Sequence, residues 1–139
     1  MKVHQIMQKQ LVSVRNTATI HDAALRMKEE GVGSVLIVDE NNRLLGIVTD
    51  RDIALAVAAE NKDPKNVCAY EIMTDEPITV ASDADIEAAL RMMSTGNVRR
   101  LPVCEKGKLV GMLSSADLAS ELKEEFDNYI GLEGGFAKH

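Results

Sequence analysis

The sequence predicts an α/β (α+β) fold in which two tandem β-α-β-β-α repeats pack on each other as one module. Three observations support this prediction. The chain repeats its apolar pattern about 66 residues apart, each copy combines strand-like and helix-like periods, and one copy of roughly 50 residues is marginal alone. We expect one module over 1–139, with a first repeat at 3–60, a linker at 61–69, a second repeat at 70–122 and a helical tail at 123–139.

The repeat begins with the same two residues in each copy. Ile6-Met7 recurs as Ile72-Met73, 66 residues later, and the same spacing relates several other positions. These are Val14 and Val80, Ile20 and Ile86, Ala23 and Ala89, Met27 and Met93, and Val32 and Val98. From Leu44 onward the spacing is 65, as for Gly46 and Gly111, so one residue is lost at a predicted turn.

Each copy opens with a short strand near Val14 or Val80, followed by an amphipathic helix. In the first helix the apolar residues recur at i, i+3, i+4 and i+7, and the second helix repeats this pattern. They are Ile20, Ala23, Ala24 and Met27, matched by Ile86, Ala89, Leu90 and Met93. Thr19 and Asp22 predict a capping box at the start of the first helix, and Asp85 is placed to cap the second.

A β-hairpin and a second helix complete each copy. The first hairpin is predicted from two apolar runs around Asn41-Asn42, and the second from two runs around Lys106-Gly107. The runs are 35–38 and 44–48 in the first copy, and 101–104 and 109–113 in the second. The polar segment 60–66 predicts a linker, and Pro64 marks a break after the helix that precedes it.

Composition argues against several classes of protein. The formal net charge of −6 is the wrong sign for binding a long polyanion such as DNA or RNA. The sequence has no apolar run long enough to span a membrane and begins with polar residues, which predicts a cytoplasmic protein. Cys68 and Cys104 lack the spacing of a zinc site, so we expect two ordinary thiols and no metal.

Three segments carry a resemblance to a known family. GIVTDRDIA at 46–54, VRRLPV at 98–103 and GMLSSADLA at 111–119 resemble the cystathionine-beta-synthase (CBS) domain family. The resemblance covers about residues 3–122, and two copies in this order resemble a Bateman module of the stand-alone bacterial or archaeal type. It implies a pseudo-twofold axis between the repeats and up to two clefts for AMP, ADP, ATP or another adenosyl compound. It also implies a regulatory role and a homodimer.

Two interpretations remain open for the start of the second helix in each copy. Thr49-x-x-Asp52 and Ser114-x-x-Asp117 fit capping boxes that satisfy free backbone N–H groups. The same helix starts also favour phosphate, and an ionised aspartate can accept hydrogen bonds from a ribose diol. The two matched copies favour the second interpretation more than one copy would.

The resemblance implies that the clefts combine residues of both repeats crosswise. The first cleft would contain Thr49, Arg51, Asp52, Thr74, Thr79, Val98, Arg99 and Arg100. The second would contain Ser114, Asp117, Gln8, Ser13, Val32 and Gly33. The first is better equipped for phosphate because arginine forms forked hydrogen bonds with oxyanions. The first repeat has Gly33-Ser34 where the second has Arg99-Arg100, so the second cleft is expected to be empty or to hold another ligand.

The leading hypothesis is a sensor that binds an adenine nucleotide and signals through its conformation, its dimer arrangement or a separate effector protein. It requires no cofactor, and S-adenosylmethionine is the alternative ligand. The competing hypothesis is a ligand-free dimeric scaffold. In the tail, Phe126, Tyr129 and Ile130 are predicted to share one exposed side of a helix, which suits a dimer or partner contact. The sequence has no Ser/His/Asp set and no phosphate-binding glycine loop, so we expect no enzyme.

Overall fold

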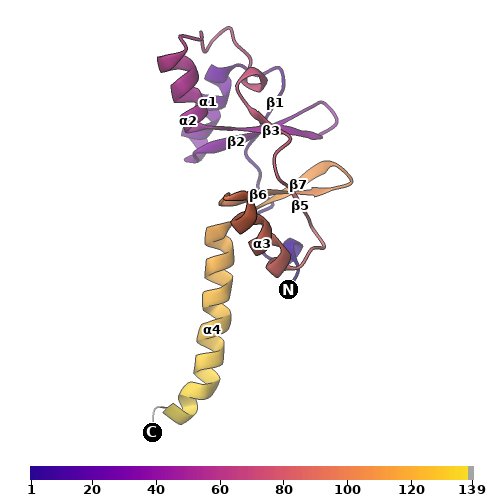
Figure 1. The fold of residues 1–139 in the computed structure, drawn as a ribbon, viewed down its shortest axis with the longest axis vertical. Helices are drawn as coiled ribbons and strands as arrows, with labels where there is room; N and C mark the ends of the chain where they lie inside the picture. The colour runs from indigo at the N-terminus through magenta and orange to yellow at the C-terminus, as the bar shows by residue number, and fades with distance from the viewer. Residues whose placement is uncertain (138–139) are drawn as a thin grey trace.

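The two halves of the molecule each contain a small β-sheet with helices on its outer side (Figure 1). A computed structural model describes residues 1–137 of the chain, and the side chains of residues 1–131. The first half contains β1 (Ser13–Arg15), α1 (Ile20–Glu30), β2 (Ser34–Val38), β3 (Leu44–Thr49) and α2 (Asp50–Ala54), which continues as a π-helical segment over Leu55–Ala59. The predicted element order is therefore present in this half.

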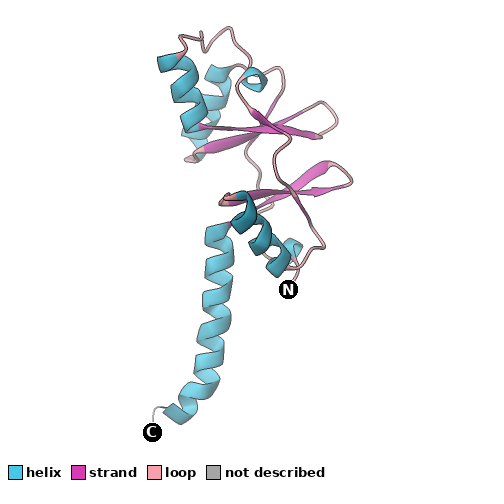
Figure 2. Ribbon diagram, viewed as in Figure 1, coloured by secondary structure: helices cyan, strands magenta, loops and turns pink. Residues whose placement is uncertain are grey.

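The second half repeats this order. It contains β5 (Val80–Ala81), α3 (Ile86–Gly96), β6 (Arg100–Glu105), β7 (Lys108–Ser114) and α4 (Ser115–Ala137). Short 3₁₀ turns at Val3–Gln5 and Ala69–Glu71 and the strand β4 (Thr74–Asp75) precede the main elements of the two repeats in the chain. Figure 2 shows the two sheets facing each other across the middle of the molecule, as the predicted fold class requires.

Strand pairing is equivalent in the two sheets except for one added strand. The first strand runs parallel to the second, and the second pairs antiparallel with the third. β4 extends the first sheet by pairing antiparallel with β3, which gives the order β1-β2-β3-β4 against β5-β6-β7. Both predicted hairpin turns form, with Asn42 at φ 62° and Lys106 and Gly107 at φ 52° and 79°. Asparagine and glycine adopt this left-handed region readily.

The halves exchange the segments that open each repeat. The N-terminal segment packs in the second half, where Val3 N donates to Ala84 O at 2.9 Å and the buried Val3 side chain joins that half's core. The segment before β4 packs in the first half, where Ala69 N donates to Ala18 O at 2.8 Å and Ala69 joins the first core. Each core is therefore completed by the other repeat.

Two glycines permit this exchange because each lies under a methionine of the opposite repeat. A Cβ atom on Gly46 would lie 2.5 Å from Met73 Sδ and 2.6 Å from Thr74 O. At the equivalent position, a Cβ on Gly111 would clash with Met7 and lie 3.2 Å from Gln8 O. The Ile-Met pairs that open each repeat thus pack against the hairpin of the other half, which requires glycine in β3 and β7.

A third apolar cluster joins the facing sheets. Leu36 and Val38 of β2 and Leu109 of β7 are buried together, between partly buried residues of both halves. The hairpin turns also meet, since Asn42 Nδ2 donates to Leu109 O at 3.1 Å and Leu109 N donates to Asn42 O at 3.2 Å. These contacts hold the two repeats as one packed unit.

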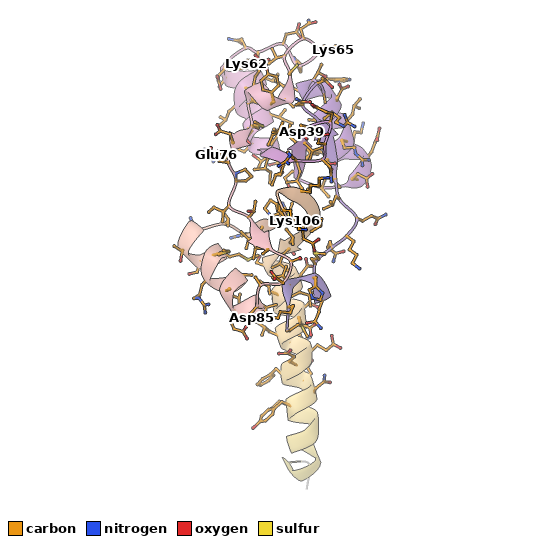
Figure 3. The ribbon with its side chains drawn as sticks, turned by 90° about the vertical axis from the view of Figure 1, so that its right-hand side faces the viewer. Asp39, Lys62, Lys65, Glu76, Asp85 and Lys106 are labelled. Atoms are coloured by element: carbon orange, nitrogen blue, oxygen red, sulfur yellow. The ribbon has the colours of Figure 1, made fainter. Side chains whose placement is uncertain are left out.

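The helix after β3 ends at Ala59, just before the predicted linker at 60–66. One local feature differs from the sequence-based expectations. Asp85 occupies the N-cap position of α3, but its side chain makes no capping hydrogen bond. The carboxylate instead pairs with Lys2 Nζ at 3.0 Å, which ties the N-terminal segment to the start of α3 (Figure 3).

The last helix is much longer than its counterpart in the first half. α4 begins against the second sheet, where Leu118 is buried, and then projects away from both halves (Figure 1). Its projecting part exposes Phe126, Tyr129 and Ile130, together with Leu122. The predicted tail is helical as far as Ala137, and 138–139 lie outside the described residues. Within 1–137, every helix is too short or too polar to cross a bilayer.

Candidate ligand clefts between the two halves

The larger cleft between the halves has a volume of about 390 Å³. This lies within the range of about 300–1,000 Å³ typical of small-molecule sites. Its walls come from β2, β3, β4, the loop after β4 and the start of β6. The lining residues are Ser34, Ile47, Thr49, Thr74, Glu76, Pro77, Ile78, Val98, Arg99, Arg100 and Pro102. Both repeats therefore contribute to it, as the crosswise arrangement implies.

Thr49 lies in this cleft at the start of α2, where it forms a complete capping box with Asp52. Thr49 Oγ1 accepts a hydrogen bond from Asp52 N at 3.1 Å, and Asp52 Oδ2 accepts one from Thr49 N at 2.9 Å. Among the described residues, Asp52 Oδ1 receives no hydrogen bond. The capping role and a contact from Oδ1 to a ligand hydroxyl are therefore chemically compatible.

The charged side chains of this cleft are two arginines and one glutamate. Arg99 and Arg100 stand at the start of β6, and Glu76 lies on the segment that joins the halves, where Figure 3 labels it. Neither arginine pairs with a carboxylate within residues 1–131. Two unpaired guanidinium groups beside apolar walls suit a ligand that carries an anionic group on an apolar body.

Three predicted residues lie outside the lining of the first cleft. Arg51 is exposed on α2, one position beyond the helix start. Asp52 is not a lining residue, but it is hydrogen-bonded to Thr49, which is one. Thr79 lines a separate hollow with Leu44 and Cys104. Thr74, Val98, Arg99 and Arg100 line the first cleft, as the resemblance implies.

A second, smaller cleft of about 230 Å³ is also lined by residues of both repeats. Its lining residues are Gln8, Gln10, Leu11, Val12, Val32, Ser34, Leu36, Arg100, Met112, Ser114 and Asp117. The second capping box forms here, with Ser114 Oγ accepting from Asp117 N at 3.0 Å and Asp117 Oδ2 accepting from Ser114 N at 3.1 Å. The two clefts thus have equivalent helix starts.

The second cleft differs from the first in the hydrogen bonds that its aspartate accepts. Gln8 Nε2 donates to Asp117 Oδ1 at 3.3 Å, so both carboxylate oxygens already accept hydrogen bonds. Ser13 lies within β1, where it pairs with Leu36, and is not part of the lining. Gly33 lines another hollow, beside Asp50. Gln8, Val32, Ser114 and Asp117 are the predicted residues that line the second cleft.

Sequence reasoning missed several lining residues, above all Ser34, Glu76 and Pro77. Ser34 carries a signal that was available, since it stands 66 residues before Arg100 and so occupies the equivalent position in the first repeat. Glu76 and Pro77 follow β4 in a segment without a distinctive pattern. Their place in the cleft depends on the pairing of β4 with β3, which joins different repeats.

The described part of the chain offers no obvious metal site. It contains no group of three or more His, Cys, Asp or Glu side chains placed to hold an ion. Cys68 and Cys104 are free thiols in separate parts of the molecule, and both are partly buried.

Two facing sheets with crosswise clefts and equivalent helix starts define a tandem repeat module of the CBS type. The sequence matches the CBS domain family over residues 3–59 and 69–124, so the chain belongs to the CBS domain family. Among curated relatives, uncharacterized protein MK0525 of Methanopyrus kandleri is 34% identical over 117 residues, which cover 84% of this chain. The chain spans 60% of the length of that relative.

Solved structures of CBS domain proteins share the fold. The CBS domain pair of MJ0100, in complex with 5-methylthioadenosine and S-adenosyl-L-methionine, has a TM-score of 0.79 at 28% identity, covering 90% of this chain and 98% of that one. PAE2072 of Pyrobaculum aerophilum, complexed with AMP, has a TM-score of 0.75 at 30% identity, covering 85% and 90%. Hypoxic Response Protein I, with two coordinated zinc ions, has a TM-score of 0.79 at 32% identity, covering 86% and 98%.

Proposed function

We propose that this chain is a regulatory module without catalytic activity that binds an adenine nucleotide, AMP, ADP or ATP, in the first cleft. The observation that carries the proposal is the pair of unpaired arginines, Arg99 and Arg100, in a largely apolar cleft of about 390 Å³ between the repeats. S-adenosylmethionine is the alternative ligand. The AMP and S-adenosylmethionine complexes of related structures support both possibilities.

Three sets of residues in the cleft contact the phosphate, the base and the ribose of the nucleotide. Arg99 and Arg100 bind the phosphate through charge-assisted hydrogen bonds. Apolar side chains such as Ile47, Ile78 and Pro102 bury the base. At the start of α2, Thr49 receives one ribose hydroxyl, and its capping partner Asp52, just outside the lining, offers the free Oδ1 as a second acceptor. Because the walls belong to both repeats, a bound nucleotide favours one arrangement of the two halves, which is the basis of a signal.

The second candidate is a ligand-free dimeric scaffold, and two observations favour it. Thr49 with Asp52 and Ser114 with Asp117 already form complete capping boxes, so neither aspartate needs a ligand to be satisfied. The apolar side chains of α4 are exposed, with Phe126 at 62% and Tyr129 at 58% of their maximum, which suits a second copy or an effector protein.

Asp52→Ala separates the two candidates, and the chain supplies a matched control. Asp22 forms the same capping box at the start of α1, with Asp22 Oδ2 accepting from Thr19 N at 3.0 Å and Thr19 Oγ1 accepting from Asp22 N at 3.1 Å. Neither aspartate is a lining residue, but Thr49, the capping partner of Asp52, lines the first cleft, whereas Thr19, the capping partner of Asp22, lines neither cleft. Loss of either cap should reduce the free energy of unfolding by about 1 kcal/mol.

The measurement is the melting temperature with and without AMP, ADP, ATP and S-adenosylmethionine. A ligand that binds only the folded state raises it by mass action. The sensor predicts a saturable rise for one of these ligands that persists in Asp22→Ala and is lost in Asp52→Ala. The scaffold predicts equal destabilisation of both variants and no rise for any ligand at millimolar concentration.

A further inference from the structure

Two residues line both clefts, and they are equivalent positions of the two repeats. Ser34 of β2 and Arg100 of β6 stand 66 residues apart in the sequence and meet across the boundary between the halves. Arg100 Nη1 lies 3.5 Å from Ser34 Oγ. Ser34 is 9% exposed, so it forms the fixed part of the shared wall, while Arg100 is exposed and carries the charge.

The shared wall contains one guanidinium group where exact repetition would place two. The first repeat has serine at this position, so Arg100 provides the guanidinium group of this pair for both clefts. Its contact with Ser34 is long and has a neutral acceptor, and hydrogen bonds weaken at such distances. A phosphate group instead accepts a forked, charge-assisted pair from arginine. An anionic ligand in either cleft therefore competes successfully with Ser34 for the guanidinium.

The remaining charges differ between the clefts. When Arg100 turns toward the first cleft, it joins Arg99 there, so two cations face the one carboxylate of Glu76. The second cleft then retains Asp117 as its single charged lining residue. An anionic ligand entering the second cleft would face this carboxylate without a cation. A neutral ligand would meet no such repulsion.

We propose that Arg100 serves both clefts and thereby makes their occupation by phosphorylated ligands mutually antagonistic. This inference rests on the proposed nucleotide-binding function and adds to it an energetic coupling between the two clefts. One phosphorylated ligand binds per chain at low concentration, in the first cleft, and the second cleft accepts a neutral nucleoside independently. Coupling between sites in proteins is typically about 5-fold to 150-fold in affinity, and we expect at least about 10-fold here.

Methyl NMR of the full chain can report on each cleft separately. Ile78 lines the first cleft and Met112 lines the second, so their labelled methyl groups distinguish the two sites. In a titration with AMP, we expect the Ile78 signal to saturate at a concentration at least about 10-fold below that of Met112. In a titration with adenosine, which lacks the phosphate, the presence of AMP in the first cleft should leave the Met112 response unchanged.

The two arginine variants give different patterns under this proposal. Arg99 lines only the first cleft, so Arg99→Ala should weaken AMP binding at Ile78 and shift the Met112 response to lower AMP concentration, because the first cleft then holds Arg100 less firmly. Arg100→Ala should weaken AMP binding at Ile78 and leave the Met112 midpoint nearly unchanged, because the second cleft already fills without this cation. Arg15→Ala, an exposed position on β1 outside both clefts, should change neither titration.

The outcomes separate the two proposals. If Ile78 and Met112 respond to AMP with the same midpoint in the unchanged chain, or if Arg99→Ala leaves the Met112 midpoint where it was, the coupling is refuted while nucleotide binding stands. If neither methyl group responds to AMP, ADP, ATP or S-adenosylmethionine, the proposed function fails, and the coupling fails with it.

Discussion

Replacing Gly46 by alanine tests the exchange of segments that builds the first cleft. A Cβ atom at this position would lie 2.6 Å from Thr74 O and 2.5 Å from Met73 Sδ. The sulfur belongs to a flexible side chain that can move aside, but the carbonyl belongs to the backbone of β4. To restore an ordinary contact distance, β4 would have to retreat from β3 by about 1 Å.

The expected cost follows from this displacement. Inserting a methyl group into a closely packed region typically destabilises a protein by about 1–3 kcal/mol. Gly46 does not have a positive φ, so alanine is conformationally allowed there and the clash is the main effect. For a chain of this size, we expect the melting temperature to fall by roughly 3–10 °C. Urea unfolding monitored by circular dichroism measures the same change, with an unchanged slope if the native state remains compact.

Gly131 supplies the control. It lies in α4, and an added Cβ would meet nothing within 4 Å. Alanine should therefore be neutral there or stabilise the helix by up to about 1 kcal/mol, because glycine loses more backbone entropy on folding. If Gly46→Ala were as stable as the unchanged chain, β4 and Met73 would not pack over β3 as described.

Two further predictions concern contacts between the repeats. Leu109→Ala removes a side chain that is 3% exposed within the cluster joining the halves. In urea titrations it should lower the free energy of unfolding by about 2–5 kcal/mol. Leu55→Ala, at a position that is 46% exposed, should have a small effect. The hydrogen bond and charge of Lys2 hold the pKa of Asp85 below its ordinary value of 3.8, and the same contact raises the pKa of Lys2. The stabilisation from Asp85 is therefore fully present at pH values above its ordinary pKa, and it is lost as the pH falls through the lower pKa of the folded protein. In carboxyl NMR titrations, Lys2→Met should return the Asp85 pKa toward 3.8, and an unchanged titration would contradict the pairing.

The candidate site was partly predictable because its two arginines stand at a position where the repeats differ. The contrast between Arg99-Arg100 and Gly33-Ser34 is enough to favour the first cleft as the site for an anionic ligand. Sequence patterns also located Thr49 at a helix start, since capping boxes depend on residues three apart. They did not place Glu76 or separate Thr79 from the cleft, because both depend on where the chain leaves β4.

The secondary structure of each repeat could be predicted from the sequence because it depends on short-range patterns. Helices, hairpins and their turns follow from local periodicity and from the conformational freedom of residues such as Asn42 and Gly107. Only the folded chain shows which half each opening segment joins, and only there do Ser34 and Arg100 form one wall between two clefts. These contacts join residues far apart in the chain. Their pairing is selected by the burial of apolar surface between the repeats, which local patterns do not specify.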